Sequence, residues 1–189
     1  MECVEPIRDK SKIALMKKLL FARNPRDHLL FVLGINSGLR ISDLLKLKVE
    51  DVLDSEGDIR ERITLREKKT GKSKDFPLSS NARSALKQYF ASLERRGKNT
   101  PELFPSRKGG ALGRVQAYRI LNDAARIVGI SGRIGTHTLR KTFGYWAYKQ
   151  GQDIVMIQKL FNHSSPSVTL AYIGITREEL DKVYIHLNL

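Results

Sequence analysis

Residues 136–143 read Thr-His-Thr-Leu-Arg-Lys-Thr-Phe, and a helical pattern of apolar residues continues from there to about residue 150. His137 and Arg140 lie three positions apart, so a helix places both side chains on the same face. Taken alone, such a pair is typical of a solvated polar patch. Its meaning depends on polar residues elsewhere in the chain.

Three further polar residues complete a chemically coherent set. His163 lies 23 residues after Arg140, Tyr172 lies nine residues after His163, and Arg40 lies far upstream. Two arginines can bind a phosphodiester, two histidines can hold or move protons, and a tyrosine can attack phosphorus. Singly, each more often has a structural role, such as a salt bridge between Arg40 and Asp43. Together they predict a site that cuts DNA by forming a covalent bond to it.

The composition favours a polyanionic partner. The chain has 189 residues, with 34 Lys and Arg against 20 Asp and Glu and a formal net charge of +14. Its isoelectric point is about 10.0. A positive field of this size attracts nucleic acid, although in other proteins the same charge serves only solubility. Hydrophobic residues make up 41% of the chain, which indicates a globular protein and not a disordered one.

Cysteine content and apolar runs bear on the cellular location. Cys3 is the only cysteine, so an intrachain disulfide is impossible. The longest apolar run, residues 29–35, is far shorter than the ~20 residues that cross a membrane, and the N-terminus lacks the apolar core of a signal peptide. We expect a cytoplasmic or nucleoid-associated protein of bacterial, phage or mobile-element origin, with no membrane partner.

Helical periodicity dominates the chain. Apolar residues recur at helical spacing through residues 13–20, with Asp9 or Ser11 as N-cap, and through residues 27–37, where Gly38 would end the helix in the left-handed conformation. Further helices are expected at residues 41–47, 80–96, 113–128, 138–150, 153–162 and 176–187, with a shorter helical turn near 166–172.

A period of two replaces the helical pattern in the front third. It predicts strands at residues 58–65 and 73–78, joined by residues 67–72 with Gly71 in the turn. Residues 103–105, Leu-Phe-Pro, form a short extended segment that anchors in the core. The predicted fold is mainly α with a small antiparallel β-sheet (α+β), in one domain.

The spacing of residues argues against two common kinds of site, a nucleotide-binding P-loop and a zinc site. Thr70-Gly71-Lys72-Ser73 is similar to the end of a P-loop, but the glycine needed five residues before Gly71 is Arg66, and the hairpin lacks the strand-to-helix context. The four histidines, His28, His137, His163 and His186, lack the spacing of zinc ligands. We therefore expect neither nucleotide hydrolysis nor a metal site.

The order Arg, Lys, His-x-x-Arg, His, Tyr resembles the tyrosine recombinase, or phage integrase, family. The resemblance runs from about residue 10 to 180 and implies the catalytic-domain fold of that family. The matching stretches are Ser37–Leu45, Lys68–Lys72, Thr136–Phe143, Leu160–Ser165 and Thr169–Tyr172.

The resemblance assigns a role to each member of the set. The implied catalytic residues are Arg40, Lys69, His137, Arg140, His163 and Tyr172. Asp43 matches the acidic position that supports the first arginine. Lys69 is the best match for the catalytic lysine, with Lys68 and Lys72 as rivals for the general acid. The family usually has glycine before the second histidine, whereas this chain has Asn162, which also tolerates the left-handed conformation at a helix end.

The chemistry implied by the resemblance needs no cofactor. Tyr172 would attack a DNA phosphodiester to give a 3′-phosphotyrosyl intermediate and a free 5′-hydroxyl. His137 is the candidate acceptor of the tyrosine proton, His163 would hydrogen-bond a phosphate oxygen, and Lys69 would protonate the leaving 5′-oxygen. A second 5′-hydroxyl would then attack the ester and complete strand exchange without ATP or a metal ion.

The expected partner is double-stranded DNA. Basic residues expected to contact it are Lys68, Lys72, Lys74, Arg107, Lys108, Arg114, Arg119, Arg133 and Lys141. Residues 1–189 are expected to form a single catalytic domain, without the N-terminal helical domain with which the family clamps DNA. We expect a tetramer on DNA for the full-length enzyme, in which the C-terminal helix packs on a neighbour, and a monomer for the chain in isolation.

Two alternatives share this fold. A type IB topoisomerase uses the same chemistry to relax supercoils, and a DNA-binding module could keep the fold without catalysis. The short chain and the Gly-Leu-Arg-Ile-Ser-Asp box at residues 38–43 favour the recombinase. The presence of every expected polar residue argues against an inactive module.

Overall fold

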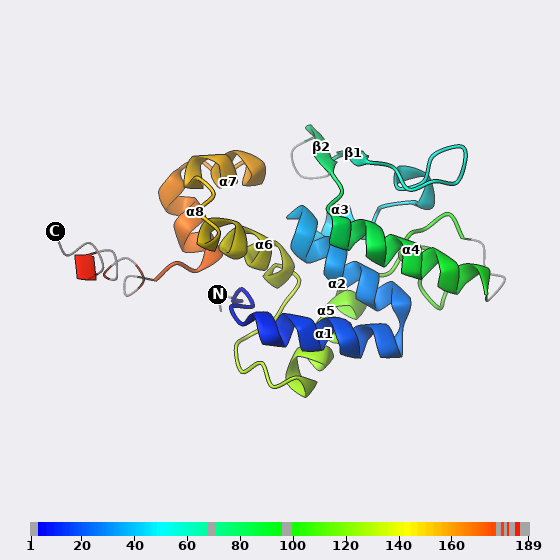
Figure 1. Ribbon diagram of the computed structural model, residues 1–189, viewed down its shortest axis with the longest axis horizontal. Helices are drawn as coiled ribbons and strands as arrows, with labels where there is room; N and C mark the ends of the chain where they lie inside the picture. The colour runs from blue at the N-terminus through cyan, green and yellow to red at the C-terminus, as the bar shows by residue number, and fades with distance from the viewer. Residues whose placement is uncertain are drawn as a thin grey trace.

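The chain folds into a mainly helical structure with one two-stranded antiparallel sheet (Figure 1), as predicted. The computed structural model describes residues 4–67, 71–95, 100–176, 179, 181 and 184–185. Its elements are α1 (Lys10–Arg23), α2 (Pro25–Ser37), α3 (Ile41–Leu44), the 3-10 helix η1 (Val49–Asp51), β1 (Arg62–Arg66), β2 (Ser73–Pro77), α4 (Ser80–Glu94), α5 (Arg114–Ile127), α6 (Thr138–Lys149), α7 (Ile154–Phe161) and α8 (Pro166–Ile173). Within the described residues, no helix is long and apolar enough to span a membrane.

Helix α2 is the centre of the larger core. The consecutive residues 29–33 are at most 2% exposed, so the helix is buried on all sides. Helices α1, α4 and α6 pack against it. Gly38 ends α2 in the left-handed conformation with φ 61°, as predicted, and Asp9 caps α1 by accepting hydrogen bonds from the amides of Ser11 and Lys12. Gly38 itself lies against α6, since a Cβ atom there would be 2.6 Å from Phe143 Cδ1.

Helices α6, α7 and α8 form a second, smaller body beside the first (Figure 1). Its core contains Tyr145, Ile157, Phe161 and Ile173, which are at most 7% exposed. Gly144 permits this close packing, because a Cβ atom there would lie 2.6 Å from Ile173 Cγ2 and 2.7 Å from Phe161 Cε2. Helix α6 also packs on α2, so it belongs to both bodies.

The β hairpin lies over one edge of the α2 body. Its strands pair from Arg62 with Pro77 to Arg66 with Ser73. Ile63 and Phe76 face inward and are buried, whereas on the outer face Arg62 Nε donates to Asp75 Oδ2 at 2.7 Å. Gly71 has φ 67°, so the predicted positive φ in the turn is confirmed.

Several predicted boundaries were wrong by a few residues. Helix α3 ends at Leu44 and not at Leu47, because the Leu47 carbonyl accepts from the amide of Leu103 at 3.0 Å and the chain there is extended. That contact confirms residues 103–105 as a core anchor, with Leu103 and Phe104 fully buried.

Strand β1 begins at Arg62 and not at residue 58, because Ile59 forms a bridge with Leu53. The predicted turn at 166–172 is a full helix, α8. Of the helix predicted at 176–187, residues 177, 178, 180, 182, 183, 186 and 187 lie outside the described residues, and residues 179, 181, 184 and 185 are helical.

The first prediction concerns the packing at Gly144. We expect Gly144→Ala to lower the free energy of unfolding by about 1–3 kcal/mol, because the added methyl group must displace the buried side chains of Ile173 and Phe161. The clash outweighs the roughly 1 kcal/mol that alanine gains in helix propensity. Denaturant unfolding measures the change. Gly113→Ala, where a Cβ meets nothing within 4 Å, is the control, and equal stability of both variants would contradict the packing argument.

Candidate active site

Arg140 lies at the junction of the two bodies. The residue is 3% exposed. Its Nη1 donates to the Gly38 carbonyl at 2.5 Å and its Nη2 to the Phe161 carbonyl at 2.9 Å. The guanidinium also stacks 4.3 Å from the Phe161 ring centroid. Burial, with the charge of Arg40, lowers the pKa of Arg140, but an arginine remains protonated even so. The chain therefore holds a permanent positive charge inside the protein.

Arg40 approaches the same place from the start of α3. It is the N-cap residue of that helix, and its side chain is 17% exposed. Its Nη1 lies 2.9 Å from Glu67 Oε2, and Glu67 is only 6% exposed. Glu67, which no sequence motif singled out, is thus a carboxylate that pairs with Arg40. Asp43 is buried, and its negative charge acts on both Arg140 and Lys74.

Tyr172 and His137 are brought together across 35 positions of sequence. Tyr172 lies on α8, and His137 immediately precedes α6. The His137 Nδ1 and Tyr172 Oη atoms are 3.4 Å apart, and Lys141 Nζ lies 5.1 Å from the centroid of the Tyr172 ring. Tyr172 is also close enough to Arg140 for a negative charge on its oxygen to act on the guanidinium. The phenol therefore faces a base and several cations.

His163 occupies the loop between α7 and α8. It follows Asn162, whose φ of 53° and ψ of 47° confirm the predicted left-handed conformation. The His163 Nδ1 atom lies 3.2 Å from Thr169 Oγ1, and that hydroxyl donates to the Ser165 carbonyl. Since the hydroxyl proton is used, the neutral ring places its own proton on Nδ1 and leaves Nε2 as an acceptor. The ring meets that of Tyr172 edge to face, with centroids 4.9 Å apart.

Both histidines are neutral at physiological pH. Burial, followed by the charges of nearby arginines and Lys141, lowers the pKa of His137 below its usual value. Burial and the charges of Arg140 and Arg40 do the same for His163. A neutral imidazole at hydrogen-bond reach of Tyr172 can accept the phenol proton.

Lys74 is the clearest surprise among the predicted DNA contacts. It lies on β2 in the alternation that turns Phe76 inward, and it is partly buried. Burial, with the positive charge of Arg140, lowers the pKa of Lys74 to about 8 despite the opposing effect of Glu67. Lys74 therefore belongs to the neighbourhood of the two arginines and not to the outer surface.

The hairpin also contacts the loop that contains His163. Lys72 Nζ donates to Asn162 Oδ1 at 3.3 Å, so the residue that replaces the family's usual glycine links the two segments. Lys68 and Lys69, the other predicted lysines of this hairpin, lie outside the described residues.

The remaining residues predicted to contact DNA are exposed, with the exception of Lys141. The exposed ones are Arg107, Lys108, Arg114, Arg119 and Arg133. Lys141, in contrast, is 5% exposed and packs on Tyr172, so it can reach only a phosphate that enters the site. In the described part of the chain, no three His, Cys, Asp or Glu side chains gather as a metal site would require.

Sequence comparison identifies relatives that match most of this chain. The family model described as "Phage integrase family" matches residues 11–179. The probable integrase/recombinase YoeC of Bacillus subtilis is 41% identical, with 97% of both chains covered. The tyrosine recombinase XerD of Mycobacterium leprae is 34% identical over 84% of this chain, which spans about half (51%) of XerD.

Solved structures show the same fold at lower identity. The XerA recombinase aligns over all of this chain and 67% of its own, with a TM-score of 0.78 and 20% identity. The XerH site-specific recombinase, crystallised on a palindromic difH substrate, aligns over 97% of this chain and 53% of its own, with a TM-score of 0.75 and 20% identity. The family model and the sequence relatives establish the classification: the chain belongs to the phage integrase family.

Proposed function

We propose that this protein cleaves and rejoins DNA as a tyrosine-type site-specific recombinase, with Tyr172 as the nucleophile. The observation that supports this best is the 3.4 Å approach of Tyr172 Oη to His137 Nδ1 beside the buried charge of Arg140. Relatives named tyrosine recombinase, and a fold shared with a recombinase crystallised on its DNA substrate, support the same activity.

The arginines supply the electrostatic part of the reaction. A phosphodiester bound between Arg40 and Arg140 would replace the mutual repulsion of the two cations with attraction. Negative charge grows on the non-bridging oxygens as the fifth bond to phosphorus forms, and guanidinium groups stabilise it most strongly in a site shielded from water.

The proton transfers follow from the histidines. His137 accepts the proton of Tyr172 while the phenolate oxygen bonds to phosphorus and the bond to O5′ breaks. His163, whose Nε2 is unprotonated in the free protein, donates to a phosphate oxygen only after it gains a proton. A bound phosphate favours that step, because its negative charge offsets the arginines that lower the pKa of His163.

The remaining proton goes to the leaving 5′-oxygen. Lys69 is our proposed donor, with Lys68 and Lys72 as the other candidates on the same hairpin. The products are a 3′-phosphotyrosyl ester and a 5′-hydroxyl, and attack by a second 5′-hydroxyl reverses the chemistry on a new strand. We further propose that a tetramer assembles on double-stranded DNA and that the free chain is a monomer.

The covalent step is the decisive test. We expect the protein to form a DNA adduct that survives denaturation, selected from a random-sequence pool of nicked duplexes in the presence of EDTA. Tyr172→Phe should form no detectable adduct, since it lacks only the attacking oxygen and keeps the ring packed against His163 and Phe161.

Tyr148→Phe is the matched control, because it removes a phenol oxygen from α6 outside the site. A denaturing gel reads the adduct, and a filter assay compares DNA affinity, which should stay within about twofold for both variants. An adduct that persists in Tyr172→Phe, or one that requires magnesium, would rule out the proposed chemistry.

Lys74→Met should raise the free energy of unfolding and slow the formation of the DNA adduct. The pKa of Lys74 in the folded protein, about 8, lies below its ordinary value of 10.5, so between these pH values the unfolded chain binds more protons than the folded one. The free energy of unfolding of the wild type should therefore rise with pH across that window. At pH 7 the methionine variant should be more stable by at most about 3 kcal/mol.

The same variant should form the DNA adduct at least about tenfold more slowly, because a cation has left the phosphate site. Denaturant unfolding at pH 7, 8.5 and 10 and the adduct assay give both readouts. Lys18→Met, which removes an exposed lysine of α1, should change neither by much. A less stable Lys74→Met, or one with undiminished cleavage, would place Lys74 outside the site.

A further inference from the structure

Helix α8 is anchored beyond its last turn by a residue from the opposite end of the chain. Tyr172 lies two positions before Gly174, which ends α8 with φ 78°. Arg8 Nη2 donates to the Gly174 carbonyl at 2.8 Å. A Cβ atom at Gly174 would lie 3.1 Å from Arg8 Nη2 and 3.3 Å from Pro6 Cδ. The N-terminal segment thus packs directly against the end of the helix that contains Tyr172.

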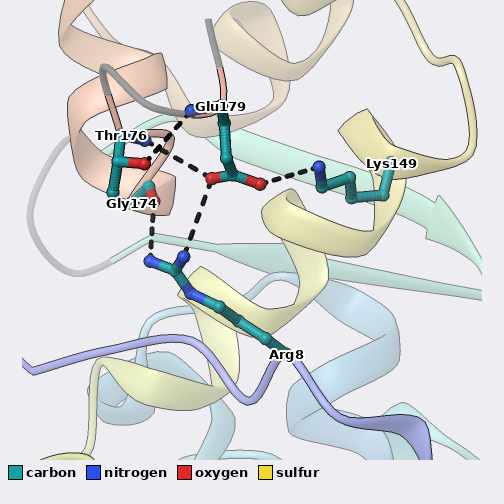
Figure 2. A network of polar contacts seen from close by, with 5 residues as sticks. All are labelled: Arg8, Lys149, Gly174, Thr176 and Glu179. Atoms are coloured by element: carbon teal, nitrogen blue, oxygen red, sulfur yellow. Dashed lines mark hydrogen bonds and ion pairs between the residues drawn. The ribbon is translucent and has the colours of Figure 1, made fainter. Parts of the chain in front are cut away.

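Glu179 joins this contact to the far end of α6. Figure 2 shows its carboxylate between Arg8 and Lys149, with Oε2 at 3.6 Å from Arg8 Nη1 and Oε1 at 2.7 Å from Lys149 Nζ. The backbone amide of Thr176 donates to the same carboxylate at 3.4 Å, and the Glu179 amide donates to the Thr176 hydroxyl at 3.4 Å. The Glu179 side chain is 11% exposed, whereas those of Arg8 and Lys149 are 36% and 38% exposed, so the carboxylate is covered by cations that themselves reach solvent.

The Glu179 carboxylate and the side chains of Arg8 and Lys149 are all charged near neutral pH. Burial alone would raise the pKa of Glu179, but the hydrogen bonds from Lys149 and Thr176 and the charges of Lys149 and Arg8 outweigh it and hold the pKa below its usual value. The hydrogen bond to Glu179 raises the pKa of Lys149. The pairing is therefore present above the ordinary pKa of a glutamate and is lost only as the pH falls through the lowered value.

Arg8 is itself held on α6. The Ile7 amide donates to Thr142 Oγ1 at 2.9 Å, and Trp146 Nε1 donates to the Ile7 carbonyl at 2.9 Å. The Arg8 guanidinium also lies 5.5 Å from the Tyr145 ring centroid. All of these partners belong to α6, the helix that contains Arg140. The contacts therefore fix α8 relative to the catalytic arginine and not merely to the surface.

We propose that Arg8, Glu179 and Lys149 are positioning residues for the nucleophile. They hold the C-terminal end of α8 against α6, while the contact between Tyr172 and His137 lies at the other end of α6. This inference rests on the proposed role of Tyr172. Its consequence is kinetic: loosening the anchor slows the attack of Tyr172 on phosphorus and leaves the binding of DNA intact, because a small displacement of a reacting group costs rate steeply.

The test compares Glu179→Gln, Arg8→Met and the double variant in single-turnover adduct formation at saturating DNA. Each single variant should be about tenfold slower than the wild type. The double variant should be no slower than the worse single one by more than about twofold, because both changes disrupt one network. DNA affinity should stay within about twofold, and Lys149→Arg, which keeps the charge, should stay near the wild-type rate.

Asp123→Asn is the matched control, since Asp123 is also shared between two cations, Arg23 and Arg126, but lies on α5. It should cleave at the wild-type rate. Hydrogen exchange without DNA supplies a second readout: the amides of α8 should exchange faster in Glu179→Gln and not in Asp123→Asn.

The outcomes separate the two proposals. A Glu179→Gln protein that forms the adduct at the wild-type rate, with unchanged exchange in α8, overturns the positioning role and leaves Tyr172 as the nucleophile. A loss of rate matched by the loss of DNA affinity overturns it too. Failure of the wild type to form any adduct would overturn the proposed function, and the positioning role with it.

Discussion

The burial of one charge, that of Arg140, is the constraint on which the rest of this structure depends. A guanidinium that is 3% exposed is tolerable only if polar groups replace the water it has lost. The Gly38 and Phe161 carbonyls do so from two directions. Both carbonyls lie at helix ends, where backbone acceptors have no partner within the helix. The ends of α2 and α7 therefore meet at this side chain, and the two bodies share the proposed catalytic arginine as part of their interface.

The same centre concentrates more positive charge than it can neutralise. Arg40, Arg140 and Lys74 lie within electrostatic reach of one another, and Glu67 and Asp43 offset them only in part. Burial, followed by the nearby positive charges, lowers the pKa of Lys74 and of both histidines. In the proposed reaction, a phosphodiester supplies the missing negative charge. The site is thus organised for an anion at the expense of the stability of the free protein, as is common where function sets the charge.

Prediction from the sequence succeeded where the cause is local. Gly38 and Asn162 could be assigned the left-handed conformation because a helix end requires it. His137, which was expected on the same helix as Arg140, is instead the N-cap residue immediately before α6. The prediction missed Glu67 as a partner of Arg40, because a carboxylate in a basic hairpin gives no sign of which arginine it meets. It gave Lys74 only as one of many expected DNA contacts, although its alternation with Phe76 was the available signal that it faces inward.

The position of Tyr172, the proposed nucleophile, shows that a motif can identify a residue without showing where the fold places it. Helix α8 has eight residues, too few to be stable alone in water, so its direction is set by what it packs against. Gly144 allows Ile173 to pack close to α6. His137 contacts the hydroxyl group of Tyr172, and Arg8 donates a hydrogen bond to the carbonyl of Gly174 at the end of α8. Arg8 lies 166 positions from Gly174, and no local pattern connects the two. A short motif thus identifies the tyrosine, whereas the position of its hydroxyl group depends on contacts that only the folded chain creates.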